Sequence, residues 1–383
     1  MKDFSEATHL DACGEDDPDA CEVLSKSERR RRAKARALPT WRETSAQTRS
    51  RRTALVKSLA LGAGFSRVGI APATALVEDR ARLQAWVDAG YHASMDWLAE
   101  SLDRRCDPGS LVAGAQAVVM LALDYDTQAP HTRDLDLRGE DRAWISRYAW
   151  GTDYHVVVER QLRTLEAAIT RALKPELGET FRGPGGPVGP FRAAQDLRWY
   201  VDHGPVLERS LAVQAGLGWR GKHSLVLHPK HGSFFFLACI VTSLGLDVDP
   251  PMMDHCGTCT ACLDACPTGA IVAPYVVDAR KCISHVTIET AGTIAQPERG
   301  LVGDHLFGCD LCQDVCPWNR FSQPVSEPAF QPRPGNVGPK LAAIEALDEA
   351  AFAERFAQSP LKRRGLVGVQ DNAAAVREGR RQR

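Results

Sequence analysis

Residues 254–267 read D-H-C-G-T-C-T-A-C-L-D-A-C-P, and residues 307–319 read F-G-C-D-L-C-Q-D-V-C-P-W-N. Between them, residues 278–284 add one more cysteine in D-A-R-K-C-I-S. Together these stretches hold eight of the twelve cysteines of the chain. Because three of these cysteines share one tight loop, we expect the region to fold around a group that binds thiolates.

The first stretch has the spacing C-x-x-C-x-x-C-x-x-x-C-P of a bacterial ferredoxin run, in which the fourth cysteine binds the other cluster of a two-cluster protein. The second stretch fits the last three positions of such a run. Its first position falls at Leu306, which cannot bind iron, and Cys282 is the spare thiol that can replace it. We therefore predict two 4Fe–4S clusters with crossed ligands: Cys256, Cys259, Cys262 and Cys316 for cluster one, and Cys266, Cys282, Cys309 and Cys312 for cluster two.

Structural zinc is the alternative use of these thiols, because four thiolates in close pairs also suit a tetrahedral zinc ion. Zinc ribbons usually present two C-x-x-C pairs separated by a longer spacer. Here three cysteines lie in one loop, and a zinc site does not explain the two Cys-Pro endings. The spacing favours the iron–sulfur interpretation.

The composition indicates a folded protein of the cytoplasm. With 383 residues, 44% of them hydrophobic, the chain is long enough for about two or three domains. We find no run near the ~18 apolar residues that span a bilayer, and no apolar segment follows the arginine run 29–32 as an export signal requires. Twelve cysteines in such a chain indicate a reducing compartment and metal binding. We expect the other four to be incidental or buried thiols: Cys13, Cys21, Cys106 and Cys239.

The net charge of −1 hides strongly charged blocks. Residues 1–22 carry eight acidic side chains, and residues 26–52 carry eleven lysines or arginines. Such blocks are typical of solvated tails, so we predict that residues 1–48 form a disordered extension. Residues 361–383 are basic again, with seven lysines or arginines, and a basic end can contact phosphates.

Strands alternating with helices between residues 50 and 250 predict an α/β (α+β) domain. Residues 117–123 are continuously apolar, as expected for a strand covered on both faces. The clearest helix lies between Asp153 and Lys174, with Val158, Leu162, Leu165, Ile169 and Leu173 at spacings of three and four. A ferredoxin-like domain at residues 251–322 and a helical tail at residues 323–383 complete the predicted architecture.

Five motifs stand in order along the chain: R-Y-A-W-G-T-D-Y-H (147–155), V-D-H-G-P-V-L-E-R (201–209), A-G-L-G-W-R-G-K-H-S-L (215–225), C-P-T-G-A-I (266–271) and G-C-D-L-C-Q-D-V-C-P-W-N (308–319). Together they resemble the motifs of the epoxyqueuosine reductases, and the resemblance covers about residues 50–360. It implies a cobalamin-dependent oxidoreductase with two 4Fe–4S clusters, which reduces the epoxide of epoxyqueuosine at the wobble position of tRNA to give queuosine.

The resemblance implies a base-off cobalamin between the α/β domain and the clusters. Reduction of the epoxide takes two electrons and two protons and releases water, so a positioned acid must protonate the departing oxygen. Asp202 matches the proton donor of the family in V-D-x-G-P. The alternative role for Asp202 is that of a turn acid or helix N-cap ahead of Gly204-Pro205.

Four further residues are cobalamin candidates under the same resemblance. His155 would line the corrin or the substrate pocket, although a histidine at a helix start can equally cap or pack. Lys222 and Ser224 would contact amide or phosphate groups of the corrin, although a Gly-Lys pair is commonly a solvated turn. The segment is not a P-loop, because Ala215 stands where the first glycine is needed. Asp310 would lie near the cofactor, because it separates two ligands of cluster two.

Two departures from the family pattern affect the expected pocket and RNA contacts. His285 stands where the family often has tyrosine. The C-terminal tail resembles the start of a HEAT-like helical-repeat region and then breaks off, and one helix pair cannot bury a repeat core alone. The remaining basic candidates for tRNA binding are Lys362, Arg363 and Arg364.

Two other functions are compatible with parts of the sequence. A reductive dehalogenase also combines cobalamin with iron–sulfur clusters but typically has a twin-arginine signal. A non-catalytic electron-transfer protein would need the clusters and no cobalamin. For the favoured function we expect a monomer in the cytoplasm that contacts no membrane, with tRNA carrying epoxyqueuosine as substrate and an unidentified low-potential electron donor.

Overall fold

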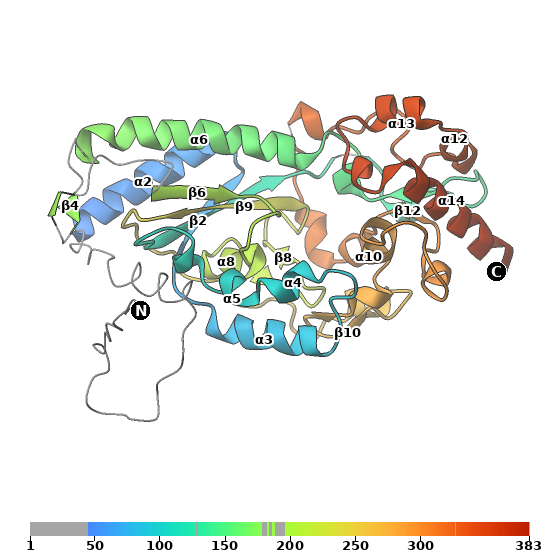
Figure 1. The fold of residues 1–383 in the computed structure, drawn as a ribbon, viewed down its shortest axis with the longest axis horizontal. Helices are drawn as coiled ribbons and strands as arrows, with labels where there is room; N and C mark the ends of the chain where they lie inside the picture. The colour runs from blue at the N-terminus through green and yellow to red at the C-terminus, as the bar shows by residue number, and fades with distance from the viewer. Residues whose placement is uncertain are drawn as a thin grey trace, which may run out of the picture.

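A four-stranded antiparallel sheet forms the centre of the molecule, with strand order β1-β2-β9-β6 (Figure 1). The computed structural model describes residues 45–127, 129–177, 182–183, 186–187, 196–325 and 327–382. The antiparallel pairing makes this the α+β form of the predicted class, since α/β folds carry parallel strands. The strands are β1 (Arg67–Pro72), β2 (Ala117–Asp124), β6 (Leu197–Tyr200) and β9 (Phe235–Thr242).

Helices cover both faces of this sheet (Figure 1). All eight residues of β2 are buried, which confirms the prediction of a strand covered on both sides. Because side chains alternate along a strand, Val119 and Leu121 pack on one face and Val118 and Met120 on the other. The first face packs against α2 (Ala46–Gly62) and α6 (Tyr154–Leu177), and the second against α8 (Glu208–Gln214) with α3 (Val77–Asp88) nearby.

The predicted helix between Asp153 and Lys174 is α6, and its apolar stripe is buried as expected. The predicted extension needs a correction at its end. Residues 1–44 lie outside the described residues, but residues 46–48 belong to α2, whose N-cap is Ser45. The side chain of Ser45 accepts a hydrogen bond from the backbone N–H of Thr48, so the helix begins earlier than the charge pattern indicated.

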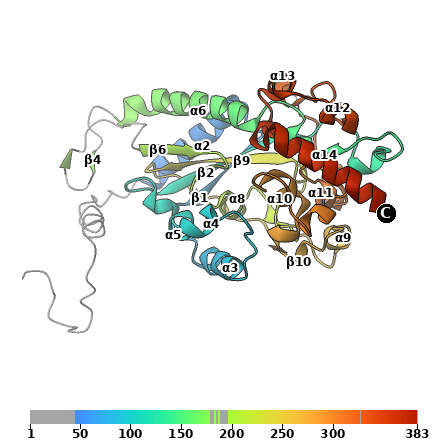
Figure 2. The same ribbon diagram turned by 45° about the vertical axis from the view of Figure 1, so that its right-hand side comes forward.

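A second core joins the middle of the chain to its end. Strand β3 (Trp144–Ile145) pairs in parallel with β12 (His305–Phe307), so the predicted domains share one core. The tail is not an isolated repeat fragment, because its helices pack on β12 and on one another (Figures 1 and 2). The helices of this core are α10 (Ile283–Ile288), α12 (Leu341–Glu345), α13 (Glu349–Phe356) and α14 (Gly365–Gln382).

Short elements complete the described part of the chain. None of the described helices is long and apolar enough to cross a membrane. The short helices are α4 (Trp97–Glu100), α5 (Leu102–Arg105), α9 (Ala261–Asp264) and α11 (Leu311–Asp314), and the short strands are β4 (Arg182–Gly183), β5 (Gly186–Pro187), β7 (Trp219–Arg220), β8 (Val226–Leu227), β10 (Ile271–Ala273) and β11 (Val276–Val277).

Candidate functional site

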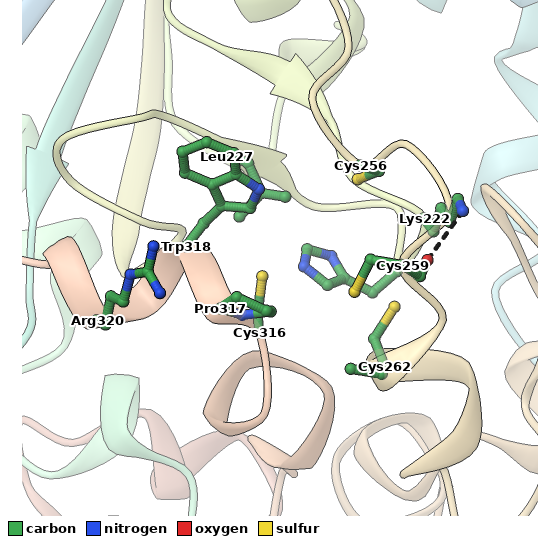
Figure 3. A pocket seen from close by; sticks show the side chains of 11 residues that line it. Lys222, Leu227, Cys256, Cys259, Cys262, Cys316, Pro317, Trp318 and Arg320 are labelled. Atoms are coloured by element: carbon green, nitrogen blue, oxygen red, sulfur yellow. Dashed lines mark hydrogen bonds between the residues drawn. The ribbon is translucent and has the colours of Figure 1, made fainter.

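Four thiols from two distant parts of the sequence line one cavity of about 180 Å³ (Figure 3). Cys256 and Cys259 come from the loop before α9, Cys262 from α9 itself, and Cys316 from the turn after α11. Figure 3 shows their sulfur atoms around a common space. The last cysteine of the second run therefore lies with the first run. Because the cavity is far larger than a single metal ion needs, this donor set fits a cubane better than zinc.

The other four cysteines lie close enough to affect one another electrostatically. Burial raises the pKa of the Cys309 thiol, and the neighbouring Cys312 and Cys282 raise it further. Burial also raises the pKa of Cys282, with a further contribution from Cys266. Thiolates destabilise one another in this way until cations compensate their charge, so the set suits iron binding.

Leu306 occupies the position where the second run lacks its first cysteine, and Cys282 is the ligand predicted to replace it. Its side chain is completely buried in β12, within the core shared with α10 and α14. Cys282 stands at the N-cap of α10, where the backbone N–H groups of Ser284 and His285 favour its thiolate. Cys282 therefore places a thiol beside the second run, where Leu306 offers no ligand.

Lys222 is hydrogen-bonded to the loop that carries Cys256 and Cys259. Its ammonium donates hydrogen bonds to the carbonyl oxygens of Gly257 at 2.7 Å and Cys259 at 2.8 Å. Two of the three N–H donors of Lys222 are therefore used on this loop, and its contact with a corrin stays a prediction. Lys222 and the backbone form a clamp that helps to hold the loop of Cys256 and Cys259.

Asp310 is close to the second cysteine set, but its carboxylate points into the protein. It is 1% exposed and accepts hydrogen bonds from Trp144 Nε1 at 3.0 Å and from the backbone N–H of Arg147 at 2.7 Å. The hydroxyl of Ser146 donates a third at 2.5 Å. Burial raises its pKa to about 6. Asp310 therefore fixes α11 to β3, and the expectation that it contacts the cofactor is corrected.

Asp202 lies on an exposed loop between β6 and α8, with a φ of 55°. Its Oδ2 accepts a hydrogen bond from the hydroxyl of Tyr154 at the start of α6. It does not cap α8, whose N-cap is Leu207. The loop is held by Gly204, whose carbonyl accepts a hydrogen bond from Arg105 at 3.1 Å. A non-glycine residue in the left-handed region marks a constrained position of the kind found at functional sites.

His155 and Ser224 are the two remaining corrin candidates. Nδ1 of His155 lies 2.8 Å from Oδ1 of Asp153, and its ring stacks on Tyr154 at 4.2 Å. Burial lowers the pKa of His155, but its contact with Asp153 outweighs this effect and the net pKa is raised. Ser224, with a φ of 68°, contacts Arg209 at 3.5 Å. His155 thus belongs to the Asp202 site, and Ser224 lies on the loop between β7 and β8.

Two tyrosines of this site were not singled out from the sequence, although both lie in the quoted segment 147–155. Tyr154 orients Asp202. Tyr148 contacts Tyr154, with ring centroids 6.2 Å apart, and its pKa is raised by burial and then by Asp202 and Glu289. The available signal in the sequence was that both tyrosines lie in the motif that also holds the candidate His155.

Glu208 is a further residue that the sequence did not indicate. It lies at the start of α8, and its Oε1 is buried with no hydrogen-bond partner among the described residues. Burial raises its pKa to about 7, and the charge of Asp202 contributes. Glu208 is therefore a buried acid close to the exposed Asp202.

The three basic candidates of the C-terminal tail differ in their surroundings. Lys362 is exposed. Arg363 pairs with Glu289 at 2.5 Å and also influences Tyr148, which places it on the Asp202 side. Arg364 is 8% exposed and donates to the carbonyl oxygens of Thr290 and Gly292, so it is not free to bind phosphate. The expectation for Arg364 is corrected.

Other charged or polar residues of the C-terminal tail and of the region near the cysteines also form contacts within the protein. Arg377 pairs with Asp141 at 3.0 Å, and Arg380 with Asp304 at 2.9 Å, so the basic end is partly neutralised by acids. His285 has its Nε2 3.0 Å from the hydroxyl of Ser94. These contacts stabilise the second core.

Comparison with protein families identifies two regions of the chain. Residues 255–319 match the 4Fe-4S double cluster binding domain, a range that contains all eight cysteines of the two sets. Residues 105–182 match the family described as epoxyqueuosine reductase QueG. The first match establishes the chain as an iron–sulfur protein with a double-cluster domain.

Curated relatives agree over most of the chain. The epoxyqueuosine reductase of Pseudomonas aeruginosa is 44% identical over 306 residues, which are 79% of this chain and 78% of that protein. That of Cellulophaga algicola is 41% identical over 325 residues, or 85% of this chain and 98% of that protein. That of Escherichia coli is 40% identical and covers 84% of this chain and 79% of its own length.

Solved structures show the same fold. A crystal structure of epoxyqueuosine reductase with an epoxyqueuosine-modified stem loop of tyrosine tRNA matches with a TM-score of 0.71 and 30% identity, covering 85% of this chain and 80% of the other. The Bacillus subtilis enzyme with its catalytic aspartate loop swung out of the active site matches with a TM-score of 0.72, 30% identity and the same coverage.

Proposed function

Because the chain belongs to the epoxyqueuosine reductases, we propose that it reduces epoxyqueuosine in tRNA to queuosine, with Asp202 as proton donor and its two clusters as electron path. Family membership makes the chain an oxidoreductase. The observation that carries the proposal is the pairing of an exposed Asp202 with the hydroxyl of Tyr154. A protein that only carries electrons would have no use for an acid positioned in this way.

Asp202 has the geometry of a positioned general acid. The hydroxyl of Tyr154 donates to Oδ2, which leaves Oδ1 to carry a proton toward the substrate. Tyr154 is itself fixed by parallel stacking on Phe236, with ring centroids 4.3 Å apart. Opening the epoxide develops negative charge on its oxygen, and a proton delivered at that atom lets it leave, with a second proton, as water.

His155 is proposed to bind oxygen atoms of the substrate beside Asp202. Asp153 fixes its ring by accepting a hydrogen bond and raises its pKa, which favours the imidazolium. An imidazolium donates from both ring nitrogens, so Nε2 can bind a substrate oxygen while Nδ1 remains on Asp153. His155 would hold the modified base in place while Asp202 transfers the proton.

The clusters are proposed to carry electrons one at a time from the protein surface toward the substrate. Cluster one would be held by the four cysteines of the cavity, and cluster two by the other set. Cys259 is exposed, so we propose that a low-potential donor protein reduces cluster one first. Charge on Cys262 raises the pKa of Cys312, which supports close placement of the two sets.

Cobalamin is proposed as the cofactor between cluster two and the substrate, and it would supply the reducing equivalents when bound. Of the residues considered for it, Asp202, His155 and Ser224 present polar atoms at the loops beside the sheet. Lys222 and Asp310 have other partners. The exposed loop with Asp202 and the polar ring of His155 fit a group whose rim carries amides.

The tRNA is proposed to lie against the C-terminal tail. Arg363 and Lys362 are exposed and basic, and Arg363 reaches the side of Tyr148 and Asp202. A phosphate there would compete with Glu289 for Arg363. All proposed groups come from one chain, so we propose a monomer, and the reduced thiols suit the cytoplasm.

The experiment is an anaerobic assay of protein with a full iron complement, supplied with cobalamin, a strong reductant and tRNA that carries epoxyqueuosine. Mass spectrometry of digested nucleosides should show the loss of one oxygen atom. Asp202→Asn should retain iron and cobalamin but lower turnover at least ~100-fold, because the proton donor is lost. Tyr154→Phe, which removes only the orienting hydroxyl, should lose less.

Each result has a defined reading. Full turnover by Asp202→Asn would remove Asp202 from the reaction. Turnover without cobalamin would remove that cofactor, and no conversion by fully loaded wild-type protein would refute the proposed substrate.

A further inference from the structure

Lys222 and His223, in the loop after β7, line the cavity that the four cysteines proposed for cluster one share. His223 lines this cavity and is 3% exposed. Its Nδ1 accepts a hydrogen bond from the backbone N–H of Leu225 at 3.2 Å. A neutral imidazole that accepts at Nδ1 must carry its proton on Nε2. His223 is therefore a buried N–H donor in a wall of the space surrounded by four thiols.

Nε2 of His223 is buried and makes no hydrogen bond to any described residue. Leaving a buried N–H unpaired costs free energy, and native proteins rarely leave one so. The sulfur atoms of an iron–sulfur cluster are acceptors of the kind this cavity would contain.

Gly221 provides the space in which the ring lies. A Cβ at this position would be 2.8 Å from Cε1 and 3.2 Å from Nδ1 of His223. It would also lie 2.8 Å from Leu227, which lines the same cavity. Any larger residue would displace the imidazole, so the backbone before His223 is shaped around its ring.

A second buried donor lies four residues before His223. Nε1 of Trp219 is buried with no hydrogen-bond partner among the described residues. The ring of Trp219 packs edge-on against that of Trp318, with centroids 5.0 Å apart, and Trp318 lines the same cavity. Two unpartnered N–H groups therefore lie at this side of the cavity.

We propose that His223 donates an Nε2–H···S hydrogen bond to cluster one, assisted by Trp219, and thereby raises the reduction potential of this cluster. Reduction adds negative charge to the cluster, and an N–H donor stabilises the more negative state. His223 is a positioning and tuning residue that does not touch the substrate. The inference rests on the proposed ligand set of cluster one.

The test is a potentiometric titration, followed by EPR, of the iron-loaded wild type and His223→Phe. The variant keeps an aromatic ring but lacks the donor. At a fixed potential, the ratio of reduced to oxidised cluster one should fall about tenfold, which corresponds to about 59 mV for one electron. Cluster two should titrate as before. The spectrum of Cys316→Ser, which should lack cluster one, assigns the two signals.

His255→Phe is the matched control, because His255 precedes Cys256 but is exposed. It should leave both potentials unchanged. Gln at position 223 keeps a side-chain N–H, so His223→Gln should recover part of the shift, and Gly221→Ala should reproduce part of it. An unchanged potential in His223→Phe, or an equal shift in His255→Phe, would overturn the proposal.

The wild type provides a test that does not depend on a folded variant. With ¹⁵N-labelled histidine, pulsed EPR of reduced cluster one should detect a coupled nitrogen and a proton that exchanges in D₂O. Absence of both would overturn the inference. Absence of cluster one itself, seen as a low iron content and a missing signal, would instead count against the proposed ligand set.

Discussion

Two short turns of this molecule have nearly the same local sequence and opposite surroundings. C-T-A-C-L-D-A-C-P at residues 259–267 contains α9, and C-D-L-C-Q-D-V-C-P at residues 309–317 contains α11. Thr260 corresponds to Asp310, and Asp264 to Asp314. Both turns present cysteines at the same spacing, so the difference lies in what the intervening side chains contact.

In the first turn these side chains face solvent, and in the second they enter the protein. The hydroxyl of Thr260 donates to Asp264 at 2.7 Å, and both residues are exposed. Asp310 and Asp314 are buried, and Asp314 accepts a hydrogen bond from the hydroxyl of Thr132 at 2.8 Å. One turn is therefore exposed, while the other is anchored to β3 and to the loop that holds Thr132.

The largest expected effect comes from replacing the last cysteine of either turn by serine. Under the proposed crossed pairing of ligands, Cys316→Ser in the second turn should remove cluster one, and Cys266→Ser in the first turn should remove cluster two. Both variants should lose turnover almost completely. Iron analysis and EPR measure which cluster remains. Loss of cluster two in Cys316→Ser would contradict the crossed pairing.

A smaller effect is expected where the turns differ in anchoring. Asp310→Ala leaves the donors of Trp144, Ser146 and Arg147 unpaired and should lower the free energy of unfolding by about 4 kcal/mol. The equivalent change Thr260→Ala removes a solvent-exposed contact and should cost less than about 1 kcal/mol. Urea unfolding under anaerobic conditions measures both. Equal losses would show that the two turns are anchored alike.

Glu208 contrasts with the paired aspartates of the two turns, because its Oε1 is buried and has no hydrogen-bond partner among the described residues. Its pKa rises from an ordinary 4.5 in the unfolded chain to about 7 in the fold. The folded state therefore binds this proton more tightly, and the resulting stability, complete below pH 4.5, is lost as pH rises toward 7 and above. Between pH 5 and pH 8 the loss should be about 2.5 kcal/mol.

Glu208→Gln should abolish this part of the pH dependence and make the protein more stable at pH 8. Urea unfolding of wild type and variant at pH 5 and pH 8 measures the difference. A variant with an unchanged pH dependence would show that Glu208 does not titrate in this range.

The smallest effect concerns the clamp on the exposed turn. Lys222→Met removes the hydrogen bonds to Gly257 and Cys259 and should loosen this loop by about 1–2 kcal/mol. Hydrogen exchange of residues 257–262 and the rate of iron release to a chelator measure the change. Lys281→Met, an exposed lysine beside Cys282, is the control and should have no effect. Equal rates in both variants would contradict the clamp.

Much of the architecture could be predicted from local sequence. The period of α6 and the apolar run of β2 are local properties, and the structure confirms both. Cysteine spacing indicated the double-cluster domain because a cubane requires a particular loop length between its ligands. The V-D-H-G-P motif indicated Asp202 as the candidate proton donor through its resemblance to the family. The structure adds its contact with Tyr154.

Side-chain partners required the tertiary structure, because they come from segments far apart in the chain. Lys222 and Asp310 lay in motifs close to the expected cofactor, but the fold directs one to a backbone clamp and the other into the β3 core. Arg364 belonged to a basic run, yet it is buried against Thr290 and Gly292. Charge patterns cannot distinguish a solvated cation from one that folding has paired.

The sequence by itself determined the elements with a local physical cause: the cysteine loops, the α6 stripe and the buried β2. Only the tertiary structure decided that the tail shares a core with β3 and β12, and that His223 lines the cavity shared by Cys256, Cys259, Cys262 and Cys316. Burial depends on contacts between distant segments. The same histidine or aspartate can therefore be solvent-exposed, structural or functional, according to what folds over it.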